Sequence, residues 1–250
     1  MKTIPSWSYS RLDVFEQCPH RAYLAYIEKS PEPPRVIPDG MDMHPLDRGL
    51  AVHSDAENYI ISEILLPPSL EKFESDFVQA KALPSNSVFA EKRMAFDSEW
   101  NKTDFFSRSA WLRMVVDLLI FDEANKTLRV IDHKTGKKYP VKHIQQGQLY
   151  AIACALLYPE YETFNTEFWY LDSGEKLERS YSLTQCLMFK DDFDRRGREM
   201  TETLNFPVKA SAWTCKWCPY NKTERGTGAC EFAYDYDNKD TAVRKSKTIS

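Results

Sequence analysis

Two periods of hydrophobic and polar positions alternate along the chain and divide it into helical and extended segments. The helical period predicts helices over residues 8–29, 46–65, 70–82, 143–158 and 183–204. Runs rich in β-branched and aromatic residues predict strands over 88–96, 105–121, 127–135 and 163–171. Residues 30–45 are rich in proline and are expected to form a loop, and 122–126 fit a hairpin turn. Pro19 suits the first turn of a new helix, so Cys18 is expected at a junction between two helices.

The order of these elements predicts the fold class. Helices come first, then three strands, a helix, a strand, a helix and a segment with three cysteines. This order is typical of an α/β protein with a small mixed central sheet flanked by helices. A length of 250 residues fits one domain, expected over residues 1–240 with its core from about 46 to 205. The cysteine-bearing segments are about 8–29 and 206–236, and residues 241–250 are expected to be a disordered tail.

Composition narrows the functional classes. Apolar residues make up 42% of the chain and charged residues 28%, as in soluble globular proteins. The net charge of −4 argues against a passive DNA coat protein, whose affinity rests on many phosphate contacts. An enzyme with a local basic groove stays compatible with it. The N-terminus lacks an apolar signal region and the longest apolar stretch, 114–121, is too short to span a bilayer. We therefore expect a cytoplasmic protein without structural disulfides.

Two carboxylates and a lysine are the first candidates for chemistry. Asp132 and Lys134 are two residues apart on a predicted strand, so their side chains share one face. Asp117 interrupts the apolar strand before the hairpin, where an unpaired charge is costly to bury. Across the hairpin, Asp117 and Asp132 can converge on one divalent cation, with the backbone carbonyl of His133 as a further ligand. A site rich in oxygen favours Mg²⁺ or Mn²⁺.

Such a site suits phosphodiester hydrolysis, with Lys134 orienting the attacking water or neutralising charge on the phosphate. An ordinary interpretation is also open. Asp132 and Lys134 can be a surface ion pair, since such triplets are common by chance, and Asp117 can sit at a bulge.

Two predicted helices add polar side chains. Gln146 and Tyr150 are four residues apart and share a helix face. His53 lies on a partly apolar helix face, and neutral imidazole is a good metal ligand. Structural roles are also open. Gln146 and Tyr150 can form the polar edge of an amphipathic helix, and His53 can be an ordinary packed histidine.

The cysteines are spaced for metal binding. Cys215 and Cys218 form a C-x-x-C pair and Cys230 follows, so a closed site needs a fourth ligand, for which Cys18 is the best candidate. Four thiolates can hold Zn²⁺ or a 4Fe-4S cluster, and the spacing does not choose between them. Such a site would clasp both ends of the chain, and its binding energy would be folding energy. Cys154 and Cys186 fit ordinary structural positions.

Taken together, these residues resemble the RecB-like branch of the PD-(D/E)XK nuclease superfamily. The iron–sulfur members of that branch include the AddB nuclease domain and CRISPR-associated Cas nucleases with a four-cysteine cluster. The resemblance runs in order through most of the chain. The matching segments are SWSYSRLDVFEQCPHRAYL, DRGLAVHSDAE with Gly49 and His53, VVDLLIF with Asp117, VIDHKTGK with Asp132 and Lys134, QGQLYAIA with Gln146 and Tyr150, and CKWCPY with Cys230 beyond it.

The resemblance implies a restriction-endonuclease-like core and a metal-dependent DNase, usually an exonuclease acting on DNA ends or single strands in recombination, repair or replication. A helicase or a recombination protein is an expected partner. Glu91 matches a glutamate often found on the strand before the catalytic hairpin; alternatively it pairs with Arg93 or Lys134. The expected catalytic residues are Asp117, Asp132, Lys134, Gln146 and Tyr150. The expected metal ligands are His53, Asp117, Asp132 and the His133 carbonyl, and the expected cluster ligands are Cys18, Cys215, Cys218 and Cys230. Their residue types alone suggest contacts with DNA, by stacking on bases or binding phosphate, for Tyr9, Arg11, Tyr150, Lys137 and Lys138.

Two other classes of function compete with this one. The first is a DNA-processing subunit that binds DNA without cutting it, against which the intact set of Asp117, Asp132 and Lys134 argues. The second is a redox or interaction module held together by its cysteines.

Overall fold

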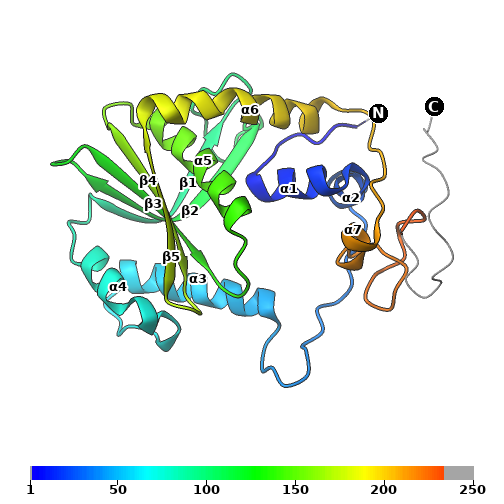
Figure 1. The fold of residues 1–250 in the computed structure, drawn as a ribbon, viewed down its shortest axis with the longest axis horizontal. Helices are drawn as coiled ribbons and strands as arrows, with labels where there is room; N and C mark the ends of the chain where they lie inside the picture. Colours follow the sequence, from blue (N-terminus) through cyan, green and yellow to red (C-terminus); the bar gives the residue numbers. More distant parts are fainter. Residues whose placement is uncertain (1, 234–250) are drawn as a thin grey trace. The chain divides into compact units, whose positions relative to one another are not determined.

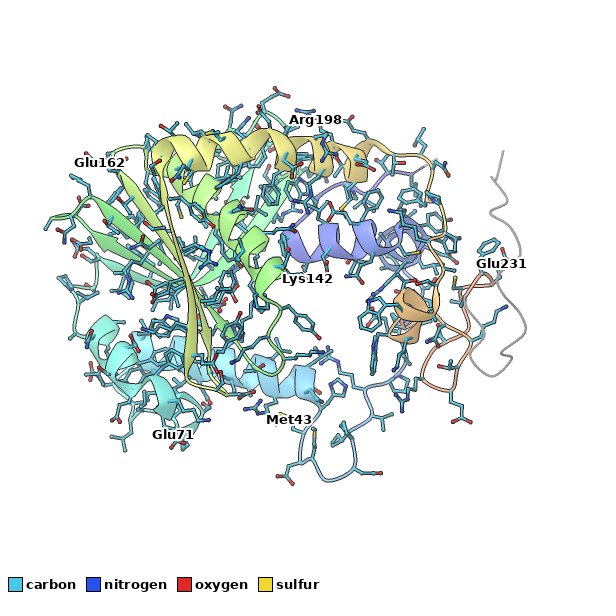
Figure 2. All side chains as sticks on the ribbon, in the orientation of Figure 1. Met43, Glu71, Lys142, Glu162, Arg198 and Glu231 are labelled. Atoms are coloured by element: carbon cyan, nitrogen blue, oxygen red, sulfur yellow. The ribbon has the colours of Figure 1, made fainter. Side chains whose placement is uncertain are left out.

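The computed structural model describes residues 2–233, which divide into two compact units (Figure 1). Val36–Phe193 form one unit, here called the sheet unit. Met1–Arg35 and Asp194–Ser250 form the other, here called the cysteine unit. The predicted tail at 241–250 and the end of the predicted cysteine segment lie outside the described residues.

The sheet unit is built on five strands in the order β1-β2-β3-β4-β5. Neighbouring strands are antiparallel except for β3 and β4, which are parallel. A parallel pair needs a long crossover, and helix α5 (Pro140–Leu157) supplies it. The mixed sheet flanked by helices confirms the predicted fold class. The strands are β1 (Val88–Phe96), β2 (Leu112–Asp122), β3 (Thr127–Lys134), β4 (Thr163–Tyr170) and β5 (Glu175–Ser182).

Helices cover both faces of the sheet (Figure 1). Successive side chains along a strand point to opposite faces, so each face carries apolar residues that a helix can bury. On one face, Gly147 of α5 lies so close to β4 that an added Cβ would be 2.8 Å from Thr166 Oγ1. On the other face, the Trp169 ring stacks on Phe73 at 5.2 Å. That face is covered by α3 (Pro45–Ile61), the 3-10 helix η2 (Pro68–Phe73) and α4 (Glu74–Lys81). Its core consists of Val52, Ala56, Tyr59, Leu70, Phe73, Phe77, Ala80, Leu118, Ile120, Ile131, Trp169 and Leu171.

The sequence pattern missed one strand and lengthened another. β5 follows the predicted turn at 172–174, but its side chains are mostly exposed and polar, as befits the edge of a sheet. It therefore carries little hydrophobic alternation to detect. The predicted strand over 105–121 begins only at Leu112, and the residues before it form turns. β5 ends in a capping box, in which Ser182 and Gln185 exchange backbone-to-side-chain hydrogen bonds at the start of α6 (Leu183–Glu202).

The cysteine unit is helical. α1 (Tyr9–Gln17) ends at Cys18, and α2 (Pro19–Tyr23) begins there with proline in its first position, which confirms the predicted junction. A π-helix, η1 (Leu24–Glu28), and the short α7 (Ala212–Lys216) complete it together with the end of α6. Arg196 on α6 binds both carboxylate oxygens of Glu16 at 2.6 and 2.9 Å. Residues 2–233 contain no helix with the length and apolar character needed to cross a membrane.

Candidate active site

The site forms where β2 and β3 separate. Their ladder ends at the pair Leu118–Ile131, so Asp117 and Asp132 are the next residue on each strand. The Asp117 carboxylate accepts a hydrogen bond from the His133 backbone N–H at 2.5 Å. On the other side of β2, the register places Glu91 of β1 opposite Asp117. Three carboxylates from adjacent strands therefore lie in one row across the sheet.

One group in this row has the geometry of a cation site. His53 of α3 places Nδ1 3.1 Å from Asp117 Oδ1. Ligand atoms of His53, Glu91 and Asp117 all lie within 4.8 Å of one another. One nitrogen and two carboxylate oxygens suit Mn²⁺ well and Mg²⁺ adequately, so these residues fit the divalent cation that the sequence predicts.

Glu91 adopts an unusual backbone conformation for a strand residue. Its φ is 48°, in the left-handed region that residues other than glycine rarely enter. Strain of this kind is kept where the surroundings enforce it, often at functional sites. Here it accompanies the approach of the Glu91 carboxylate to His53 and Asp117.

A hydrogen-bonded network holds Asp132. Lys134 Nζ lies 2.5 Å from Asp132 Oδ1, while Oδ2 accepts hydrogen bonds from Gln146 Nε2 at 3.0 Å and from the Tyr150 hydroxyl at 2.8 Å. The Gln146 oxygen in turn accepts from Lys134 Nζ at 3.1 Å. Because α5 packs against β4 and the neighbouring β3, the Gln146 and Tyr150 side chains reach the end of β3. The structure thus brings these four predicted residues together.

The surroundings shift the pKa values of Asp132 and Asp117 in opposite directions. Burial raises the pKa of Asp132, and the charge of Asp117 adds to the rise although Lys134 opposes it. Burial also acts to raise the pKa of Asp117, but the hydrogen bond from His53, the charge of His53 and the hydrogen bond from the His133 backbone N–H oppose it, and this pKa is lowered. Carboxylates with separated pKa values are a common feature of sites that handle protons or cations.

The pKa values of His53 and Glu91 are both raised as well. Burial favours neutral His53, but the hydrogen bond and charge of Asp117 raise its pKa above the usual value. Burial raises the pKa of Glu91, and the charges of Asp117 and Glu57 raise it further. Glu57 lies one turn after His53 on α3 and was not among the predicted residues. A bound cation would relieve this repulsion among carboxylates.

The His133 side chain is buried beside the rings of Phe77, Trp169 and His53. This burial lowers its pKa to about 4, so the ring is neutral near pH 7. The backbone N–H of His133, rather than its carbonyl, makes the contact with Asp117. The ligand role of the carbonyl stays a prediction.

A cleft of about 680 Å³ opens over the site. Its walls include Arg48, Thr135 and Gly136, which the sequence did not single out, and the predicted DNA contact Lys137. Arg48 binds Asp172 through its two terminal guanidinium nitrogens, at 3.0 and 2.5 Å, and Asp172 also accepts a hydrogen bond from the Gly136 N–H at 2.7 Å. These bonds tie the loop after Lys134 to α3. The partners are distant in sequence, so no local signal could have found them. The other predicted contact, Lys138, pairs with Glu175 at 2.5 Å.

The four predicted cluster cysteines line one small cavity in the cysteine unit: Cys18, Cys215, Cys218 and Cys230. Within residues 2–233 they do not form a group of three ligand atoms as tight as that of His53, Glu91 and Asp117. Cys154 and Cys186 are fully buried, as expected of structural residues. Of the other predicted DNA contacts, Arg11 lies over the Tyr26 ring at 4.9 Å, in the same unit as Tyr9.

Two solved structures illustrate a distant similarity to the chain. The crystal structure of SSO0001 is 13% identical, with 88% of this chain and 85% of that chain covered and a TM-score of 0.36. A structure from Eubacterium rectale, described as a candidate exonuclease, is 14% identical, with 78% and 80% covered and a TM-score of 0.40. No curated protein matches the chain.

The family comparison covers far more of the sequence than any single motif. The model of the PD-(D/E)XK nuclease superfamily matches residues 6–223. This range includes the row of carboxylates, Lys134 and the C-x-x-C pair. With the mixed sheet and the site at the strand ends, it assigns the chain to a family: the protein belongs to the PD-(D/E)XK nuclease superfamily.

Proposed function

We propose that the protein is a metal-dependent DNA nuclease that hydrolyses phosphodiester bonds, and that it acts as an exonuclease on DNA ends or single strands in recombination, repair or replication. The observation that carries the proposal is the convergence of two groups at the end of one hairpin. His53, Glu91 and Asp117 form a cation site, and Asp132 with Lys134 forms a paired carboxylate and ammonium beside it.

His53, Glu91 and Asp117 would hold Mn²⁺ or Mg²⁺, with Asp132 as the further carboxylate ligand. When bound, the cation supplies Lewis-acid polarisation of the scissile phosphate and a water of lowered pKa. The imidazole favours Mn²⁺, since Mg²⁺ prefers all-oxygen sites.

Lys134 has the role of a charged donor next to the reacting phosphate. Its ammonium is held by Asp132 and Gln146, so its position is fixed before substrate arrives. Gln146 and Tyr150 position Asp132 through two hydrogen bonds to the same oxygen. Preorganised donors of this kind need no rearrangement when charge develops in the transition state.

The four cysteines are proposed to hold a 4Fe-4S cluster, with Zn²⁺ as the alternative. Their common cavity fits a metal group bound by thiolates. The separation of the thiol sulfurs in space, unlike their spacing in sequence, favours the cluster. A zinc ion with bonds of about 2.3 Å draws its sulfurs to within roughly 4 Å of one another, and no three of these thiols form so tight a group within residues 2–233. The cluster would join Cys18 to the C-terminal cysteines and stabilise the fold of this unit.

The test of the catalytic proposal is digestion of DNA labelled at its 5′ or 3′ end, single- and double-stranded, with Mn²⁺ or Mg²⁺. We expect Asp117→Ala and Lys134→Ala to lower the rate by about 100-fold or more. Matched controls come from the same strands: Asp122→Asn on β2 and Lys126→Ala just before β3 should cut as the wild type does. Full activity in Lys134→Ala would remove the assignment.

The test of the cluster is analysis of iron, sulfide and zinc in protein purified without oxygen. We expect iron and sulfide, and their loss in Cys215→Ser but not in Cys154→Ser. Protein that contains none of these elements would refute a metal group at the cysteines.

A further inference from the structure

The six tryptophans of the chain fall into two groups that differ in exposure. Trp7, Trp100, Trp111 and Trp169 are buried. Trp213 and Trp217 are 79% and 65% exposed. Large aromatic side chains are costly to leave in water, and exposed ones of this size often mark binding surfaces.

The two exposed tryptophans lie close together in sequence at α7. Trp213 is in the helix, and Trp217 is the residue that ends it. Lys216 lies between them in sequence and places its ammonium 5.3 Å from the centre of the Trp217 ring. Cys215, in contrast, is buried and lines the cysteine cavity. This segment thus buries Cys215 and leaves two indoles and the ammonium of Lys216 exposed.

The local structure fixes this surface. Ser211 caps α7 by accepting a hydrogen bond from the Thr214 N–H at 3.0 Å. The Asn221 side chain donates to the Cys215 carbonyl at 2.9 Å. The indoles are therefore carried by anchored backbone, which lowers the entropy that binding would cost.

The stretch of sequence that contains the indoles is positively charged, although the whole chain has a net charge of −4. Residues 203–223 contain three lysines, Lys209, Lys216 and Lys222, and no acidic residue. All three lysines are exposed. The nearest acidic residues that follow in sequence are Glu224 and Glu231.

We propose that Trp213 and Trp217 form a stacking platform for unpaired bases of DNA, with Lys216 and its neighbouring lysines binding the phosphates. This surface, here called the Trp213–Trp217 platform, lies outside the cleft and its substrate class rests on the proposed nuclease function. Aromatic rings with interleaved cations are the chemistry by which proteins hold single strands without reading their sequence. Lysine is depleted at the centres of protein interfaces, so the charge favours nucleic acid over a protein partner.

The experiment measures binding of a labelled short oligothymidylate to the full-length protein in EDTA, where no cleavage occurs. We expect Trp213→Ala and Trp217→Ala each to weaken binding about fivefold or more, as loss of one stacked base implies. Trp→Phe at either position should restore most of the affinity. The control Phe106→Ala removes an aromatic ring that is 74% exposed in the sheet unit and should change nothing.

An abasic oligonucleotide of equal length separates stacking from phosphate binding. The alanine variants should bind it as the wild type does, whereas Lys216→Ala should weaken both and reduce the salt dependence. Unchanged thymidylate binding in both alanine variants would overturn the platform even if the protein cuts DNA. So would binding to vesicles of phosphatidylglycerol but not to oligonucleotide. Conversely, variants that lose binding in a chain that never cuts DNA would support the platform and refute the nuclease.

Discussion

The Tyr150 hydroxyl donates a hydrogen bond to Asp132 Oδ2 at 2.8 Å, and both side chains are buried. Gln146 donates to the same oxygen, and Lys134 binds the other one. The pKa of Tyr150 is raised, first by burial and then by the charge of Asp132, so the hydroxyl keeps its proton, donates a hydrogen bond to the carboxylate and accepts one from Gln146 Nε2 at 2.7 Å.

Tyr150→Phe should therefore destabilise the protein and slow cleavage together. The change removes one donor to a buried charged group and almost no volume, which costs about 1.5–3 kcal/mol. Urea denaturation measures this loss, and Tyr158→Phe at the end of α5 is the matched control. If Tyr150→Phe unfolds at the wild-type urea concentration, the hydroxyl does not support Asp132.

Glu91 predicts opposite effects on stability and on metal binding. Glycine adopts a φ of 48° without strain, so Glu91→Gly should raise the free energy of unfolding of the metal-free protein by about 1 kcal/mol. The same change removes a ligand and should weaken Mn²⁺ binding by tenfold or more, an order-of-magnitude figure for one ligand. Calorimetry measures both quantities.

Glu91→Gln separates the two effects. It keeps the strained backbone and loses only the charge, so it should weaken Mn²⁺ binding, and any gain in stability it shows measures relief of the repulsion from Asp117 and Glu57. The further gain in Glu91→Gly then measures the relief of backbone strain. A Glu91→Gly variant that binds Mn²⁺ as tightly as the wild type would exclude Glu91 from the cation site.

The affinity for Mn²⁺ should rise with pH through the raised pKa of His53. Asp117 stabilises the protonated ring in the metal-free protein, while a metal ligand must be neutral, so binding releases a proton. Titration calorimetry in buffers of different ionisation enthalpy measures the number of protons released when Mn²⁺ binds. His53→Asn should abolish its release; an unchanged count would mean that another group titrates.

The same pKa makes a prediction for folding without metal. Because the folded pKa of His53 lies above the unfolded value of about 6.5, its contribution to stability is complete below that pH. The contribution is lost as the pH rises through the folded pKa.

His133 should make the fold sensitive to acid. Its folded pKa is about 4, because the buried ring resists protonation, whereas the unfolded chain takes up a proton below about 6.5. The stabilisation is therefore complete above pH 6.5 and is lost as the pH falls towards 4, up to about 3 kcal/mol. Urea denaturation at pH 7 and pH 5 measures it.

His133→Phe should flatten this pH dependence, since the site already packs against Phe77 and Trp169. His143, whose pKa is also lowered to about 4 by burial, should contribute in the same direction. An equal loss of stability on acidification in wild type and His133→Phe would show that His133 is not the acid-sensitive group.

The sequence predicts best the helices and strands that have a buried face, because burial requires apolar residues at regular intervals along them. β3, α5 and β4 are all buried on their inner faces, and their predicted limits agree with the structure to within three residues. Cys18 and Pro19 were placed at a helix junction from the conformational preference of proline alone. β5 was missed because an exposed edge strand needs no apolar alternation.

The site divides in the same way. Strand and helix periods predict that Asp132 shares a face with Lys134 and Gln146 with Tyr150, whereas the joining of the two pairs in one site was implied only by the family resemblance. The left-handed φ of Glu91 and the bonds between Arg48 and Asp172 could not be predicted in either way, because they arise when elements distant in sequence are packed together. The local conformational preferences of the sequence cannot predict such contacts.

The parallel pairing of β3 and β4 through α5 has a consequence for how the site comes apart. The bonds that hold Asp132 join residues at most 18 apart, whereas Asp117 depends on His53 from α3 and neighbours Glu91 from β1. Opening of α3 alone would dismantle the cation site and leave the β3–α5–β4 crossover folded. On heating, the protein would therefore release the cation and lose activity at a lower temperature than the one at which its β3–α5–β4 unit unfolds.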